Sequence, residues 1–122
     1  MINHSQERRK HRRLDNNIAL KISGSDADIV TETRNLSCSG AYCKVDKSLE
    51  LMAKLKIHLL LPFKKNKKTT TKRVSCQGVV VRVDPQPQSD FCYAAIYFND
   101  ISEKDRKHIE DYIESVLAPK TS

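Results

Sequence analysis

The chain has 122 residues, enough for one domain but too few for two domains of ordinary size. Its 39% hydrophobic and 30% charged residues are typical of a globular protein and exclude a disordered or fibrous chain. The longest apolar run is far shorter than the roughly 20 residues of a membrane-spanning helix. Residues 1–7 contain no hydrophobic segment of a signal peptide, so the sequence predicts a cytoplasmic protein without membrane insertion.

The net charge of +7 is concentrated in two clusters that hold half of the 22 Lys and Arg residues. The first cluster lies between residues 8 and 13. It belongs to a segment, residues 1–13, that lacks apolar periodicity and is predicted to be a flexible arginine-rich arm. The second lies between Lys64 and Arg73 and contains no acidic residue. Clustered cations favour an anionic partner, although a solvated loop is the preferred explanation for the second cluster.

Residues 14–118 are predicted to form a single domain made mainly of β-strands. Short segments alternate apolar and polar residues, as half-buried strands do. Pro62 is expected to end the fourth strand, residues 64–72 to form a loop, and Gly78 to mark a bulge. Six short strands in so small a domain predict an antiparallel β-barrel. The strands are expected at residues 18–22, 27–36, 40–45, 55–61, 74–83 and 91–98.

The last segment changes from strand periodicity to helical periodicity. The letters S-E-K-D at residues 102–105 resemble a capping box, and Pro119 follows as a helix stop. An α-helix is therefore expected at about residues 102–117. Its apolar residues fall on one helical face. They are Ile109, Tyr112, Ile113, Val116 and Leu117.

The sequence shows no pattern of catalytic or metal-binding residues. It contains no G-x-S-x-G, no H-E-x-x-H and, with three glycines in all, no glycine-rich phosphate loop. The four cysteines form no C-x-x-C pair, so they are interpreted as reduced core residues in preference to zinc ligands. The sequence therefore predicts a protein that is not an enzyme and that has neither a cofactor nor a metal site.

Two stretches are not explained by local structure. One is the arginine arm, and the other is N-L-S-C-S-G at residues 35–40, where an amide, a hydroxyl and a glycine interrupt a strand. The period of two in a strand places Asn35 and Ser37 on the same face. Gly40 has no Cβ, so a backbone turn or a flat ligand can approach it closely. Taken alone, the stretch is better explained as a turn stabilised by Asn or Ser side chains.

In combination, the two stretches resemble the PilZ domain family. The family's R-x-x-x-R motif is met by R-K-H-R-R at residues 9–13, and Arg8 matches the arginine that often precedes it. The family's (D/N)-x-S-x-x-G motif is met by residues 35–40, and its G-x-V-x-R is matched loosely by residues 78–82. The resemblance covers nearly the whole chain. It implies a β-barrel that binds cyclic diguanylate (cyclic di-GMP), a bacterial second messenger.

The resemblance also implies which side chains contact this nucleotide. They are Arg8, Arg9, Arg13, Asn35, Ser37 and Gly40. Each guanine presents adjacent O6 and N7 acceptors, which match the two-pronged fork of arginine, and the phosphates add negative charge. Lysine would supply the charge without the fork, so Lys10 is expected to be dispensable, as is Arg12. Asn35 stands where the family often has aspartate, and because an amide is not a charged acceptor, a lower affinity is expected.

The leading hypothesis is a stand-alone bacterial receptor whose arm folds onto the barrel when cyclic diguanylate binds. The ordered arm would create a surface for a downstream protein, by resemblance one of motility, exopolysaccharide or pilus machinery. One alternative is a small basic barrel that binds RNA or single-stranded DNA through the lysines at 64–73. It is disfavoured because most of the seven aromatic residues are expected to be buried. Another alternative is a PilZ-like adaptor without ligand binding, which the intact motifs argue against.

Overall fold

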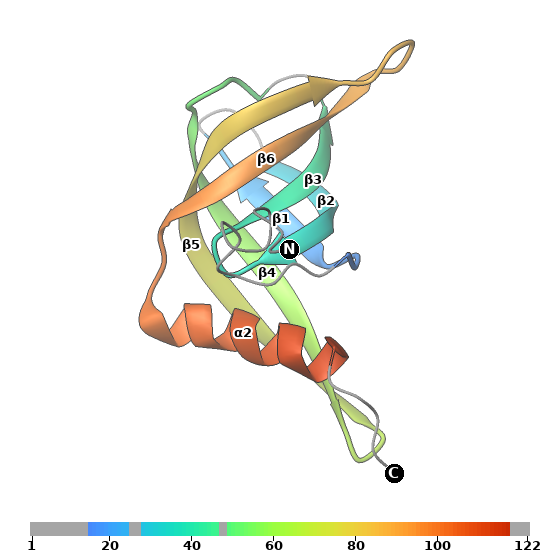
Figure 1. Cartoon of the computed structure of the whole chain (residues 1–122), viewed down its shortest axis with the longest axis vertical. Helices are drawn as coiled ribbons and strands as arrows, with labels where there is room; N and C mark the ends of the chain where they lie inside the picture. Colours follow the sequence, from blue (N-terminus) through green and yellow to red (C-terminus); the bar gives the residue numbers. More distant parts are fainter. Residues whose placement is uncertain (1–14, 25–27, 47–48, 118–122) are drawn as a thin grey trace, which may run out of the picture.

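Six strands and a C-terminal helix make up the part of the chain that the computed structural model describes, residues 15–24, 28–46 and 49–117 (Figure 1). They are β1 (Ala19–Ser23), β2 (Asp28–Ser37), β3 (Gly40–Asp46), β4 (Lys54–Lys65), β5 (Lys68–Pro85), β6 (Phe91–Asp100) and α2 (Glu103–Leu117). The strands close into an antiparallel barrel in the order β1-β2-β3-β6-β5-β4, and β4 pairs with β1. The mainly β fold class, the six-stranded barrel and the C-terminal helix are therefore confirmed.

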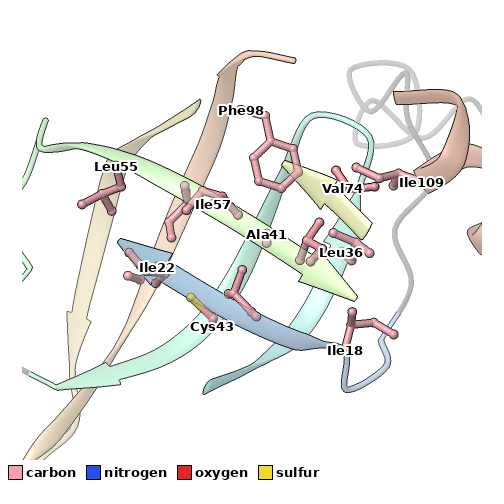
Figure 2. Packing of buried hydrophobic residues seen from close by; sticks show 14 of the residues in the cluster. Ile18, Ile22, Leu36, Ala41, Cys43, Leu55, Ile57, Val74, Phe98 and Ile109 are labelled. Carbon is pink, nitrogen blue, oxygen red and sulfur yellow. The ribbon is translucent and has the colours of Figure 1, made fainter. Parts of the chain in front are cut away.

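The barrel is filled by every second side chain of its strands. In β1, the buried Leu20 and Ile22 alternate with exposed neighbours, and β4 repeats the pattern with Ile57 and Leu59. Figure 2 shows how Ile22, Cys43 and Ile57, from three different strands, meet in one interior. Each fully buried aliphatic side chain contributes about 1.5–3 kcal/mol relative to exposure. A core without tryptophan is thus assembled mainly from aliphatic residues.

None of the four cysteines, all of which the structure describes, forms a disulfide. Three of them, Cys38, Cys43 and Cys92, are buried in the core, and Cys76 is half-buried. The interpretation of these residues as packing residues is therefore confirmed.

Two irregularities bend β5 where it pairs with β6. The register shifts between Gln77 and Val79, which confirms the bulge predicted at Gly78. It shifts again between Val80 and Arg82, where neither glycine nor proline marks the position in the sequence. Because bulges increase the local twist of a strand, they allow the long β5 to curl from its pairing with β4 to its pairing with β6.

Helix α2 packs against β4 and β5. Its first turn is capped by Ser102, whose hydroxyl accepts a hydrogen bond from the backbone N–H of Asp105 at 3.1 Å. The buried residues of the helix are Ile109, Tyr112 and Ile113. Val116 and Leu117 each remain 44% exposed, so the predicted apolar face is buried only from Ile109 to Ile113.

The segment around Pro62 corrects the sequence prediction. Strand β4 continues past Pro62 to Lys65, and the expected loop at residues 64–72 is instead the end of a β4–β5 hairpin. Strand β1 pairs with β4 only as far as Leu60, so β4 is an edge strand beyond that point and tolerates a proline, which lacks the N–H of a ladder hydrogen bond. Asn66 and Lys67 have φ values of 54° and 67°, which close the hairpin in the tight turn typical of two-residue loops.

The predicted arm, residues 1–13, lies outside the described residues. No helix among the residues that are described combines the length and the apolar character needed to cross a bilayer.

Candidate functional site

The N-L-S-C-S-G stretch forms the end of β2, a tight turn and the start of β3. Asn35 and Ser37 lie on one face of β2 and alternate with the fully buried Leu36, so the expected common face is confirmed. Asn35 lies opposite Tyr42 and Ser37 lies opposite Gly40 on β3. The motif residues of the barrel are therefore neighbours, with Asn35 and Gly40 partly exposed and Ser37 buried.

Ser37 stabilises the turn that joins β2 to β3. Its hydroxyl accepts a hydrogen bond from the backbone N–H of Ser39 at 3.2 Å and lies 3.0 Å from the hydroxyl of Ser39. It also donates a longer bond, 3.4 Å, to the carbonyl of Gly40. The turn is thus of the serine-stabilised kind that local sequence alone suggests. This role fixes the geometry that any ligand of the motif would meet.

Gly40 is required by the approach of another strand. A Cβ at this position would collide with the backbone carbonyl oxygen of Ile96 on β6 and come within 3.4 Å of the Cα of Tyr97. The φ angle of Gly40 is not positive, so left-handed backbone conformation is not the reason for the glycine. The absence of a side chain lets β3 and β6 lie close together beneath the motif.

A shallow depression of about 340 Å³ lies over these residues. Its floor includes a row that crosses four neighbouring strands, because Asn35 is opposite Tyr42, Tyr42 is opposite Ala95, and Ala95 is opposite Arg82. Gly40 and Tyr97 form the adjoining row. The volume is within the range of roughly 300–1,000 Å³ usual for small-molecule sites, and the depression is open to solvent on its outer side.

Arg82 is held at this depression by Asp84. One carboxylate oxygen of Asp84 accepts hydrogen bonds from Arg82 Nε at 3.0 Å and from the hydroxyl of Tyr42 at 2.6 Å, and it lies 2.8 Å from Arg82 Nη2. These bonds, with the Tyr42 bond the stronger, lower the pKa of Asp84. Burial, together with the bond to Asp84, raises the pKa of Tyr42. The depression therefore carries an arginine fork in a fixed position, next to a neutral phenol.

Aromatic and basic side chains continue from Tyr42 across the outer face of the sheet. Tyr42 stacks on Tyr93, with ring centroids 5.4 Å apart. The guanidinium of Arg34 lies 4.9 Å from the Tyr93 ring centre and donates a 2.6 Å hydrogen bond to its hydroxyl. Arg34, Tyr93 and Lys44 border a second depression of about 480 Å³.

This arrangement corrects the expectation that most aromatic residues are buried. Only Phe98 and Tyr112 of the seven are buried. The side chains that are half-buried or exposed are Tyr42, Phe63, Phe91, Tyr93 and Tyr97. Flat outward-facing rings are available for stacking on a base, which strand alternation around Tyr42 and Tyr93 could have indicated.

Asn16, just after the predicted arm, is hydrogen-bonded to β2, the strand that carries Asn35. The carbonyl of Asn16 accepts a 2.8 Å hydrogen bond from the hydroxyl of Thr33, and the side-chain amide of Asn16 donates a 2.8 Å bond to the hydroxyl of Tyr112. Thr33 and Asn35 are two residues apart on β2. The predicted ligand residues Arg8, Arg9 and Arg13 themselves lie outside the described residues.

A comparison with protein-family models matches residues 7–115 to the PilZ domain. The chain belongs to the PilZ domain family. The match begins just before the R-x-x-x-R motif at residues 9–13 and ends within helix α2, so it includes both motif stretches. Family membership makes this PilZ domain one of a group of receptor and adaptor domains associated with cyclic diguanylate.

The PilZ domain is also similar to a solved structure, the inhibitor of motility MotI/DgrA of Bacillus subtilis. The two share 21% sequence identity with a TM-score of 0.76, and the match covers 93% of this chain and 53% of the other. This chain therefore spans about half the length of that protein, and the likeness concerns the fold. No match was found among curated proteins.

Tyr42, Arg82 and Tyr97 line the depression but are absent from the set that motifs alone predict. Arg82 belongs to the loosely matched G-x-V-x-R stretch, which was a usable signal, whereas Tyr42 follows the second motif by two residues and had only its strand position to indicate it. Neither can be assigned from spacing, since strand pairing across β3, β6 and β5 brings them together. Within the described ranges, no cluster of His, Cys, Asp and Glu suits a metal ion.

Proposed function

We propose that this PilZ domain is a non-enzymatic receptor that binds cyclic diguanylate between its arginine arm and the outer face of β2, β3, β6 and β5. The observation that carries the proposal is the position of the N-x-S-x-x-G motif. Asn35 and Gly40 line an open depression, two residues along β2 from the point where the chain leaving the arm is fixed to Thr33. An open depression beside a tethered basic segment suits a ligand that is enclosed when the segment closes over it.

The floor of the depression offers the groups that a guanine nucleotide needs. The Asn35 amide can donate to and accept from a guanine edge, and the hydroxyl of Ser39 can meet a phosphate, while Ser37 holds the turn that carries both. Arg82 adds a fork already oriented by Asp84, and the exposed ring of Tyr97 adds a face for stacking. Arg82 and Tyr97 therefore join Arg8, Arg9, Arg13, Asn35, Ser37 and Gly40 as proposed contacts.

The arm is long enough to supply the remaining forks. Arg13 is three positions before Asn16, which is bonded to β2, and such a stretch spans at most about 11 Å. Arg9 is seven positions before the same point, which allows up to about 25 Å. Thr33, to which Asn16 is bonded, lies two residues from Asn35, roughly 7 Å along a strand, so both arginines have enough chain to reach Asn35. The adjacent pair Arg8 and Arg9 favours two stacked nucleotides over one.

Calorimetric titration of the full chain with cyclic diguanylate tests this proposal. Saturable binding with micromolar or tighter affinity is expected, and the stoichiometry decides between one nucleotide and two. Arg9→Lys keeps the charge but removes the fork, so it should lose most of the affinity. Arg12→Lys is the matched control and should bind like the wild type. Arg9→Lys with wild-type affinity would contradict the bidentate role.

Two further ligands separate the alternatives. GTP and a short single-stranded oligonucleotide should not compete at concentrations that saturate cyclic diguanylate binding. Binding to every polyanion, with a steep dependence on salt, would instead favour a general nucleic-acid binder. Absence of binding to all three would favour an adaptor that works through protein contacts alone.

A receptor without a catalytic site must pass its signal on through a surface. We propose that the ordered arm, together with the face it covers, forms that surface for a downstream protein in the cytoplasm. The structural neighbour is named an inhibitor of motility, so components of motility machinery are the first candidates to test. Exopolysaccharide and pilus machinery are the other candidates that the family suggests. A pull-down with and without cyclic diguanylate should recover the partner only in its presence.

A further inference from the structure

The hairpin of β4 and β5 is the most basic element of the chain. From Leu51 to Val83 the sequence has nine Lys and Arg residues and no Asp or Glu. The tip alone carries Lys64, Lys65, Lys67 and Lys68. Within the described residues, the ion pairs join Lys21 to Asp28, Arg82 to Asp84 and Lys107 to Asp111, and none includes a lysine of this hairpin. Apart from Arg82, which pairs with Asp84, the cations of the hairpin therefore have no ion-pair partner among the carboxylates of the described residues.

The distal part of this hairpin is a two-stranded ribbon separate from the barrel. Strand β1 pairs with β4 only up to Leu60, and β6 pairs with β5 only from Gln77 onward. Only residues 61–65 and 68–72 therefore pair with one another alone, and we name this part, with Arg73 at its base, the basic ribbon. Figure 1 shows its tip projecting past α2, away from the barrel. Helix α2 packs on its base through Phe63, whose ring lies edge-on to Tyr112 at 5.8 Å.

Cations occur on both faces of the basic ribbon. Directly opposed residues of an antiparallel pair share a face, and the face alternates along each strand. Lys65 and Lys68 are opposed, so they share one face, on which Lys72 also lies. Lys64 lies on the other face, as does Arg73. All five side chains are exposed.

We propose that the basic ribbon inserts into the major groove of double-stranded DNA. A flat partner, such as a lipid surface or an acidic patch of a protein, meets one face of a ribbon and leaves the other in water. A groove with phosphates on both of its walls meets both faces. The B-form major groove is about 12 Å wide and admits a two-stranded ribbon, whereas the deep, narrow major groove of A-form RNA does not.

Two features of the neighbourhood agree with this placement. Three consecutive threonines of β5, at residues 69–71 opposite Pro62–Lys64, carry hydroxyls that can bond phosphate oxygens alongside the lysines. Helix α2 carries more acidic than basic residues, so phosphates are repelled from the base of the ribbon and contact is confined to its projecting part. The surface is also different from the proposed nucleotide site, which lies on β2, β3, β6 and the far half of β5.

The test measures binding of the full chain to a fluorescent mixed-sequence DNA duplex over a series of salt concentrations. Three double variants each lose two positive charges. Two are on the ribbon: Lys65→Gln with Lys68→Gln on one face, and Lys64→Gln with Arg73→Gln on the other. The third, Lys104→Gln with Lys107→Gln on α2, is the control. Each ribbon variant should bind more weakly and lower the slope of log affinity against log salt by about 2, since each lost phosphate contact contributes about 0.9. The control should keep the wild-type slope. Removing the opposed Lys65 and Lys68 charges relieves repulsion, so folding is not expected to suffer.

The outcomes distinguish groove insertion from other contacts. Loss of binding in both ribbon variants, with weaker binding of an RNA duplex of the same sequence, supports the proposal. Loss in only one variant overturns it and indicates a flat partner, as does binding to anionic vesicles without binding to the duplex. Equal or tighter binding of single strands or of the RNA duplex overturns it as well. So does DNA binding that neither ribbon variant weakens.

Discussion

At Gly40 the backbone of β3 runs so close to β6 that a single methyl group could not be placed between them. The nearest atoms belong to the backbone of Ile96 and Tyr97, which cannot rotate away as a side chain can. Gly78 differs, because its closest neighbours are side-chain atoms, Ile96 Cγ2 at 2.6 Å and Ile57 Cγ1 at 3.1 Å. The two glycines therefore allow one substitution to be compared in two surroundings.

Gly40→Ala should destabilise the domain by about 2–3 kcal/mol, because the strands must separate to admit the new atom. Gly78→Ala should cost less, about 1–2 kcal/mol, since the isoleucine side chains can adjust. Urea unfolding of both variants measures the difference. An equal or smaller loss for Gly40→Ala would show that close packing of β3 on β6 is not the reason for this glycine.

Cys43 shows what burial does to a thiol. Burial, and to a lesser degree the neighbouring Cys92, raises the pKa of Cys43 from 9.0 to about 12. The folded chain therefore keeps this proton in a range where the unfolded chain loses it. The stability that Cys43 contributes is fully present below pH 9 and is lost as the pH rises from 9 toward 12.

Cys43→Ala should remove this part of the pH dependence. Between pH 9 and 11 the unfolding free energy of the wild type should fall more steeply than that of the variant, by about 1 kcal/mol per pH unit. The cavity left by the substitution lowers the whole curve without changing its slope. Urea unfolding at a series of pH values measures both, and parallel curves would refute the assignment.

At the scale of elements, neighbours decide where each strand or helix ends. Pro62 does not stop β4, because β1 has already ended beside Leu60 and the missing N–H faces no partner strand. Helix α2 begins where Ser102 satisfies a backbone donor that the helix itself leaves unpaired. The cap is the cleaner case for a test, since it depends on a single hydroxyl.

Ser102→Ala should destabilise the domain by about 1 kcal/mol, the usual value for loss of a serine cap. Ser115→Ala is the matched control in the same helix. Its hydroxyl bonds only to the carbonyl of Tyr112, which the helix already accommodates, so a change within about 0.5 kcal/mol is expected. Thermal unfolding of the two variants gives the comparison. Equal midpoints would mean that the first turn of α2 does not need its cap.

At the scale of the whole molecule, the barrel offers a prepared face and the arm is proposed to cover it. Asn16 bonds to both Thr33 on β2 and Tyr112 on α2, so the chain enters the barrel at a fixed point beside the motif. Closure of the arm would then need no movement of the barrel. This division of roles predicts that ligand binding changes the accessibility of the arm and leaves that of the basic ribbon unaltered.

Limited digestion with trypsin tests this prediction. Cleavage within residues 8–13 should slow several-fold when cyclic diguanylate is present, because the arginines become enclosed by ligand and barrel. Cleavage at the turn lysines of the ribbon, Lys67 and Lys68, serves as the internal control and should proceed at an unchanged rate. Equal protection of both sites would indicate a general stiffening of the protein. No protection of the arm would contradict its closure.

Much of the fold was predictable because the local sequence patterns agree with the secondary structure that forms. Alternation placed the core positions of β1 and β4, the S-E-K-D sequence located the start of α2, and Gly78 marked a bulge. The basic ribbon was not predictable, because a run of lysines and threonines without apolar alternation is typical of a loop. It forms strands here because the residues on either side of the Asn66–Lys67 turn pair with one another across the hairpin.

The candidate site divides in the same way. The family and the motif residues could be predicted from the sequence, because spacing along one chain is enough to place Asn35, Ser37 and Gly40 on one strand–turn–strand unit. The position of Arg82 and Tyr97 in the same depression could not, since strands distant in sequence must pair before those side chains meet. Strand pairing joins residues that are distant in sequence, so it cannot be inferred from local composition.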